Sequence, residues 1–193
     1  MRADAARNRD RILEVTRELI ARDGPSVSMD EIAAAAGVAV GTLYRHHPTK
    51  AALVDAVVRH SVEQLAALTH EALARVLAGA PAGPELAALF GVVARRHAHD
   101  DAVKAAAASL GSVVPMPDGG GFVPGTPEQD AWTSIQRLLA AAVAEGTVRA
   151  DLTPLDLLAL LSGTPGPPLP DDVRERYIDI VLVGIAPPAG PVG

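Results

Sequence analysis

Residues 28–50 read SMDEIAAAAGVAVGTLYRHHPTK, and they form the most informative stretch of the chain. Ser28 and Glu31 have the spacing of a capping box, in which each side chain satisfies a backbone N–H at the start of a helix. The pattern predicts a short helix over residues 29–36, because alanine is a strong helix former and Gly37 suits a left-handed helix end.

A second short helix is predicted over about residues 40–47, since Pro48 ends it. Two helices of this length with a tight turn have the dimensions of a helix-turn-helix, whose second helix fits the major groove of DNA. The residues expected to face the supporting helix are Ile32, Ala35, Ala36 and Leu43. The residues expected to face outward are Val40, Thr42, Tyr44, Arg45 and His46.

The rest of the chain also has helical spacing, and no alternating strand pattern occurs. Helices are predicted over residues 9–22, 50–77, 85–97, 101–110, 128–145, 154–162 and 171–185. Thr153 and Pro154 suit the first positions of the helix that follows them. Residues 111–127 are rich in glycine and proline, which is typical of a long loop. The sequence therefore predicts an all-α fold.

The motif and its surroundings resemble the DNA-binding domain of TetR-family transcriptional regulators. The resemblance covers about residues 8–67 without gaps. It is carried by Ile12, Leu13, Leu19, Gly24, Ser28–Ala33, Ala36–Val38, Gly41–His46, Pro48–Lys50 and Leu53. It implies an N-terminal three-helix DNA-binding domain over 8–67 and a C-terminal helical domain over 80–187 for ligand binding and dimerisation.

The resemblance also implies which residues contact DNA. Residues 40–46 would form the recognition helix. The expected DNA-binding residues are Ser28, Val40, Gly41, Thr42, Tyr44, Arg45, His46 and Lys50. Among them Thr42, Val40 and Arg45 would meet bases, whereas Tyr44, Lys50 and Ser28 would meet phosphates.

Two positions depart from the family pattern. Ala39 stands where the family often has serine, so the recognition helix is expected to lack a side-chain cap. His47 stands where the family usually has an inward-packed phenylalanine, and its spacing from Leu43 predicts that it still points inward. An imidazole there could loosen the motif or make DNA binding sensitive to pH.

The second domain offers weaker signals. The candidate residues for a ligand pocket are Phe90, Val93, His97, Leu110, Trp132, Ile135 and Leu139, although residue for residue they favour an ordinary core. The loop 111–127, with Met116 and Phe122, could act as a lid. A dimer interface is expected at Leu157, Leu158, Leu161, Tyr177, Ile178 and Val181, because residues 154–162 are apolar nearly all round.

Composition narrows the function further. The 193 residues contain no cysteine and carry a net charge of −6, with 8 basic against 7 acidic residues in 1–50 and 9 against 16 in the remainder. DNA binding is therefore expected only at the N-terminal end. We find no spanning apolar run, signal peptide, metal-ligand cluster or catalytic constellation. We expect a soluble cytoplasmic protein that is not an enzyme and has no metal or cofactor.

The sequence thus predicts a homodimeric regulator that binds a palindromic double-stranded DNA operator. The first hypothesis is a repressor released by a small hydrophobic effector. A ligand-independent or activating regulator of the same fold stays open, as does a helical adaptor or enzyme with a vestigial helix-turn-helix.

Overall fold

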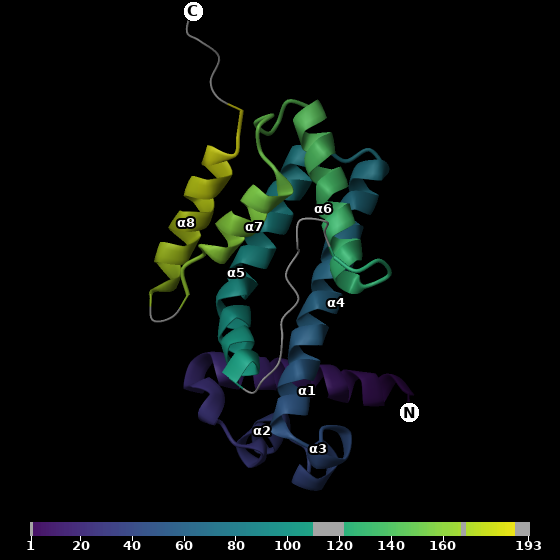
Figure 1. Cartoon of the computed structure of the whole chain (residues 1–193), viewed down its shortest axis with the longest axis vertical. Coiled ribbons are helices and arrows are strands. Elements are labelled where there is room, and N and C mark those ends of the chain that lie inside the picture. Colours follow the sequence, from purple (N-terminus) through teal and green to yellow (C-terminus); the bar gives the residue numbers. More distant parts are fainter. Residues whose placement is uncertain (1, 110–121, 167–168, 188–193) are drawn as a thin grey trace, which may run out of the picture. The chain divides into compact units, whose positions relative to one another are not determined.

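The computed structural model describes residues 2–109, 122–166 and 169–187, and every regular element in these ranges is helical (Figure 1). The all-α prediction is confirmed. The elements are α1 (Arg2–Asp23), the 3-10 turn η1 (Gly24–Ser26), α2 (Met29–Ala36), α3 (Val40–His46), α4 (Lys50–Leu77), α5 (Ala82–Ser109), α6 (Pro127–Ala144), α7 (Pro154–Ser162) and α8 (Asp171–Gly184).

The described residues divide into two compact units. The first unit comprises residues 2–62 and 99–109, and the second comprises residues 63–98, 122–166 and 169–187. Helices α4 and α5 each contribute one end to each unit. The last turns of α5 therefore belong to the unit that contains α1–α3, whereas we expected residues 80–187 to form the C-terminal domain.

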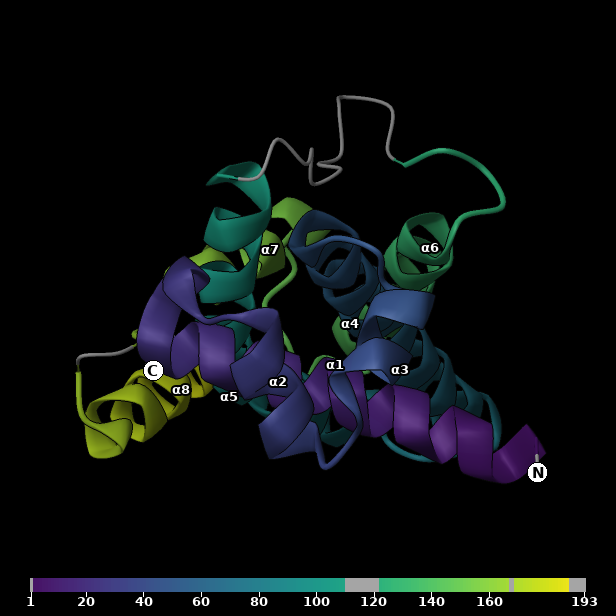
Figure 2. The same ribbon diagram turned by 90° about the horizontal axis from the view of Figure 1, so that it is seen from below.

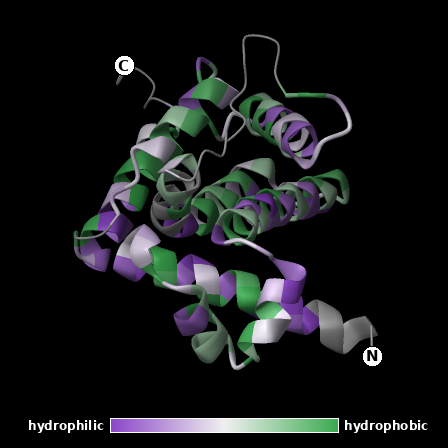
Figure 3. Ribbon diagram, turned by 60° about the horizontal axis from the view of Figure 1, so that its bottom comes forward, coloured by the Kyte–Doolittle hydropathy of each residue, from purple (hydrophilic) through white to green (hydrophobic). Residues whose placement is uncertain are grey.

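The first unit is built around one apolar core. In α2, the buried residues Met29, Ile32, Ala33 and Ala36 form an i, i+3, i+4, i+7 stripe. Ala35 was expected to face inward but is exposed, because it lies beside that stripe and not on it. Hydrophobic and hydrophilic residues occupy different faces of the helices, as amphipathic helices require (Figure 3). The other buried residues of this core are Ile12, Leu13, Ile20, Val27, Leu43, Leu53, Val54, Val57, Val103 and Ala106.

Helix α5 is continuous from Ala82 to Ser109, whereas two helices with a break near residues 99–100 were predicted. That part of the sequence contains neither glycine nor proline, so no residue interrupts the backbone hydrogen bonds. Pro84 lies in the first turn of α5, where a helix tolerates proline because the N–H has no intrahelical partner.

The start of α5 is fixed by the segment that follows α6. The Glu145 carboxylate accepts hydrogen bonds from the Ala82 N–H at 2.8 and 3.0 Å, which satisfies a free donor of the first turn. A Cβ at Gly83 would lie 2.5 Å from Thr147 Oγ1, so this approach requires glycine. This contact joins two segments that are 63 residues apart in the sequence.

Helices α7 and α8 are held within the second unit by polar contacts as well as by packing. The Tyr177 hydroxyl donates to the Leu160 carbonyl at 2.5 Å, and Arg95 pairs with Glu175 at 2.9 Å. Thr153 caps α7 and Pro154 is its first residue, as predicted. The buried residues of this core are Ala72, Ala82, Leu86, Leu89, Phe90, Ala94, Leu138, Leu139, Ala142, Val148, Leu157, Ile178, Val181 and Ile185.

Candidate nucleic-acid interface

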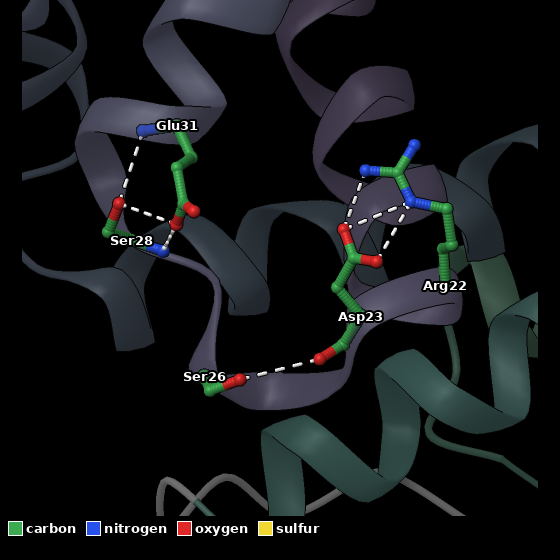
Figure 4. Close-up of polar contacts among 5 residues, drawn as sticks. All are labelled: Arg22, Asp23, Ser26, Ser28 and Glu31. Carbon is green, nitrogen blue, oxygen red and sulfur yellow. Dashed lines mark hydrogen bonds and ion pairs between the residues drawn. The ribbon is translucent and has the colours of Figure 1, made fainter.

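The capping box at the start of α2 is formed as predicted (Figure 4). The Ser28 N–H and hydroxyl both donate to Glu31 Oε2 at 2.7 Å, and the Glu31 N–H donates to Ser28 Oγ at 3.2 Å. These hydrogen bonds from Ser28 lower the pKa of the Glu31 carboxyl. The Ser28 side chain, expected at a phosphate, therefore already has an intramolecular partner.

The turn before α2 is organised by short-range polar contacts and by one long-range contact. Arg22 pairs with Asp23 at 2.6 Å, which raises the pKa of the guanidinium and lowers that of the carboxyl, and Ser26 Oγ donates to the Asp23 carbonyl (Figure 4). The Lys50 ammonium, at the start of α4, donates to the carbonyls of Pro25 and Val27. Lys50 thus joins the beginning of α4 to the turn between α1 and α2.

Gly37 makes the tight turn between the two helices of the motif. Its φ of +67° is in the left-handed region, where a Cβ is strained. The Val38 N–H donates to the Ala33 carbonyl at 3.0 Å, which completes the end of α2. The Arg11 guanidinium of α1 lies beside this turn, with Nη2 3.5 Å from the position that a Gly37 Cβ would take.

Helix α3 is anchored by Leu43, which is fully buried. Ala39 provides no side-chain cap, as predicted, and only its carbonyl accepts the first N–H groups of the helix. Thr42 is half-buried. The remaining predicted contact residues of α3 are exposed: Val40, Gly41, Tyr44, Arg45 and His46. Val40 and Tyr44, and likewise Gly41 and Arg45, are one helical turn apart and form a single outward face.

His47 follows α3 and is partly buried. Burial lowers the pKa of its imidazole, and the positive charges of His46 and Arg9 lower it further, while a backbone hydrogen bond at Ala52 opposes them. The imidazole is thus held neutral to lower pH than a free histidine. This agrees with the predicted inward position, and it places Arg9 of α1 near the end of the recognition helix.

Comparison with known proteins agrees with this geometry. Residues 12–57 match the family model of bacterial regulatory proteins of the tetR family, and residues 121–187 match the C-terminal domain of SbtR-like transcriptional regulators. A TetR transcription regulatory protein from Mycobacterium vanbaalenii is 36% identical, and the match covers 96% of this chain and 98% of that one, with a TM-score of 0.72. The chain belongs to the TetR family of transcriptional regulators.

Other similar proteins match over different lengths. The TetR regulator SCO0520 from Streptomyces coelicolor is 29% identical over 94% of this chain and 99% of its own, with a TM-score of 0.69. A γ-butyrolactone receptor described as ArpA-like is 25% identical over 97% of this chain and 92% of its own, with a TM-score of 0.59. A helix-turn-helix regulator of Staphylococcus aureus is 39% identical over 64 residues, about a third of each protein.

The residues predicted to line a ligand pocket mostly lie in the core of the second unit. Phe90 and Leu139 are buried there, and Val93 and Ile135 pack against the same core. His97 is also buried. Trp132 is half-buried and meets Phe122 edge to face, with 6.0 Å between ring centroids. Leu110 and Met116 lie outside the described residues, as does most of the loop expected to act as a lid.

The residues predicted at a dimer interface divide into two groups. Leu157, Ile178 and Val181 are buried in the core of their own unit, which corrects the expectation that they face a partner. Leu158, Leu161 and Tyr177 are half-buried. The large apolar side chains that α7 and α8 expose are instead Leu155, Ile180 and Val183. Sequence alone could not separate the two faces, because both carry leucine, isoleucine or valine.

In the described ranges no three histidine, aspartate or glutamate side chains are placed to hold a metal ion. No helix in that part of the chain is long and apolar enough to cross a membrane.

Arg9 and Arg11 are the residues near α3 that sequence reasoning missed. Both lie at the start of the helix predicted over residues 9–22, and no role was predicted for them. One signal was available, because Arg9 precedes Leu13 by one helical turn and so continues the buried stripe of α1 beyond the core.

Proposed function

We propose that this TetR-family protein is a repressor that binds a palindromic DNA operator as a homodimer and is released by a small hydrophobic ligand. The observation that carries the proposal is the exposed face of α3, which presents Tyr44, Arg45 and Gly41. Leu43 of the same helix is buried in the core and holds α3 in place. A helix of seven residues with this face suits the major groove.

The outward residues of α3 supply complementary kinds of contact. A Cβ at Gly41 would meet nothing within 4 Å, so DNA can approach the backbone closely there. The Tyr44 hydroxyl and the Arg45 guanidinium are hydrogen-bond donors for phosphates and base edges. Val40, which is 36% exposed, can contact a thymine methyl group. Thr42 is half-buried and contributes its hydroxyl beside them.

The test is an in vitro selection of bound DNA from a random pool at a fixed salt concentration, since affinity depends steeply on salt. We expect a two-fold symmetric motif whose half-sites lie about one helical turn of DNA apart. Absence of any enriched motif, with a folded protein in hand, would overturn the proposal and favour a helix-turn-helix kept only as structure.

Point variants then assign the selected motif to α3. We expect Thr42→Ala and Tyr44→Phe each to weaken operator binding by about 5- to 160-fold per lost contact, which corresponds to a loss of about 1–3 kcal/mol. Thr133→Ala is the matched control, because Thr133 is an exposed threonine on α6 of the second unit. Equal affinity in the control and the α3 variants would contradict the assignment.

The exposed apolar residues of α7 and α8 support the proposed homodimer. Ile180 is 64% exposed and Val183 is 77% exposed, and both lie on the same side of α8, about one turn apart. Large apolar side chains on neighbouring helices are typical of surfaces that another protein covers. Two helices from each subunit would form a four-helix interface around the symmetry axis.

We infer that the effector is a small apolar molecule because the core of the second unit is mainly apolar. In the described part of this unit the buried side chains are mostly apolar, and the buried polar ones are Thr69, His97, Ser134, Thr164 and Arg174, so a mainly lipophilic molecule fits better than a sugar or nucleotide. The similarity to a γ-butyrolactone receptor makes lipophilic lactones a sensible first class to test. A ligand that binds one tilt of α4 more tightly than another would shift the DNA-binding equilibrium by that difference.

Trp132 provides the measurement for the effector, because it is the only tryptophan in the chain. Binding near the Phe122–Trp132 pair should change its fluorescence at the ligand concentrations that release operator DNA. Release of DNA without any change in Trp132 emission would place the ligand elsewhere. If none of the tested apolar ligands releases operator DNA or changes Trp132 fluorescence, this part of the proposal is refuted.

A further inference from the structure

The N-terminal half of α1 extends past the core of the first unit. Leu13, Thr16 and Ile20 are fully buried and form one stripe of the helix. Arg9 lies one turn before Leu13 on the same stripe, yet it is exposed. On this side of α1 the buried residues therefore stop at Leu13, and the next residue toward the N-terminus is the exposed Arg9. Figure 2 shows this half of α1 running beside α3.

Arg9 and Arg11 lie near opposite ends of the recognition helix. Arg11 reaches the turn before α3, where its Nη2 lies 3.5 Å from the position of a Gly37 Cβ. Arg9 is close enough to His47, the residue that follows α3, to act on its charge. Figures 1 and 2 both place α3 along the N-terminal half of α1. Each end of the seven-residue helix thus has an arginine of α1 nearby.

In the described part of the chain, Arg9 and Arg11, the arginines near the two ends of α3, form no ion pair with a carboxylate. The charged groups that act on the His47 imidazole are His46 and Arg9, both cationic in their charged forms. In the described part of the chain no ion pair occupies Arg9 or Arg11, and Arg11 makes only a 3.4 Å hydrogen bond to Asn8. Asp10 projects about 100° around the helix from each of its two neighbours.

We propose that Arg9 and Arg11 bind phosphodiester groups of the DNA on either side of the recognition helix. This inference rests on the proposed function and extends the interface from α2–α3 to α1. A helix in the major groove has a sugar-phosphate backbone along each side of the groove, so cations near both of its ends meet phosphates. A guanidinium binds phosphate through paired N–H donors and keeps its charge at every physiological pH.

The chemistry of phosphate contacts makes the proposal measurable. Each phosphate contact releases counterions from the DNA, so the slope of log K against log salt steepens by about 0.9 per contact. Two subunits on one operator would contribute each contact twice. Loss of one arginine should therefore flatten the slope by about 1.8. The ratio of wild-type to variant affinity should then fall about 12-fold between 50 and 200 mM salt.

The experiment measures operator affinity by fluorescence anisotropy across this salt range for Arg9→Gln, Arg11→Gln and the double variant. Arg137→Gln is the matched control, because Arg137 is an exposed arginine on α6 that removes the same charge from the second unit. Arg9→Lys and Arg11→Lys keep the charge and should keep most of the slope. Thermal melts establish that each variant is folded before binding is measured.

We expect flatter slopes for the α1 glutamine variants, a wild-type slope for Arg137→Gln, and the same selected DNA motif throughout, since phosphates carry no base identity. Wild-type slopes in the α1 variants would overturn the proposal while the proposed function stands. A changed motif would show that these arginines read bases and would also overturn it. A wild-type protein without any sequence preference would instead refute the proposed function itself.

Discussion

We expect the Lys50→Met variant to lose stability, because the Lys50 ammonium donates to the carbonyls of Pro25 and Val27. These carbonyls belong to the turn between α1 and α2, more than twenty residues away in sequence. Val27 is buried, so its carbonyl is poorly placed to find water once the ammonium is gone. Methionine keeps the length of the side chain and removes only the charge and the donors.

The magnitude follows from the contacts. A hydrogen bond from a charged donor contributes about 1.5–3 kcal/mol when it is sheltered from water. Lys50 is only partly buried, and ordering a lysine side chain costs up to about 2 kcal/mol. The net loss in the free energy of unfolding should therefore be about 1–2 kcal/mol. For a chain of this size, that corresponds to a decrease in Tm of about 2–8 °C.

The assay combines urea unfolding with the salt dependence of operator binding. If Lys50 mainly holds the turn, Lys50→Met destabilises the protein and flattens the salt slope by less than the roughly 1.8 expected when a dimer loses one phosphate contact from each subunit. Lys50→Arg is the control, because it keeps the charge. Unchanged stability together with a slope flattened by a full contact would refute this reasoning and support the phosphate role implied by the family resemblance.

Three further predictions concern other parts of the chain. His47→Phe should make the protein less sensitive to acid, because the pKa of His47 is lowered in the folded state, so its contribution to wild-type stability is full above about pH 6.5 and falls below that pH. Between pH 8 and pH 5, Tm should therefore fall less in the variant than in the wild type. Parallel Tm curves would contradict this. Glu145→Ala should lower the urea unfolding free energy by about 1–2 kcal/mol, because the Ala82 N–H loses its acceptor at the start of α5, and an unchanged value would exclude this capping role. Ile180→Asp should give a folded monomer in sedimentation velocity, because Ile180 is 64% exposed within its own chain; a dimer of wild-type affinity would place the interface elsewhere.

The helix-turn-helix could be predicted from sequence because its signals are local. Ser28 and Glu31 are three residues apart, and their capping box depends only on the backbone between them. The same holds for Thr153 and Pro154 at the start of α7. The break expected near residues 99–100 was wrong because charged and polar residues were interpreted as a helix end, although nothing there prevents helical hydrogen bonds.

Most of the helices, the capping motifs at Ser28 and Thr153, and the family could be predicted from the sequence alone, since each depends on residues within about one helical turn or on a gapless local motif. The contact partners of the long side chains, and the apolar faces that are buried, depend on the tertiary structure. It directs the Lys50 ammonium to carbonyls and Arg11 to the turn at Gly37, and it buries Ile178 while exposing Ile180. These outcomes depend on contacts between segments distant in sequence, which periodicity along one helix does not encode.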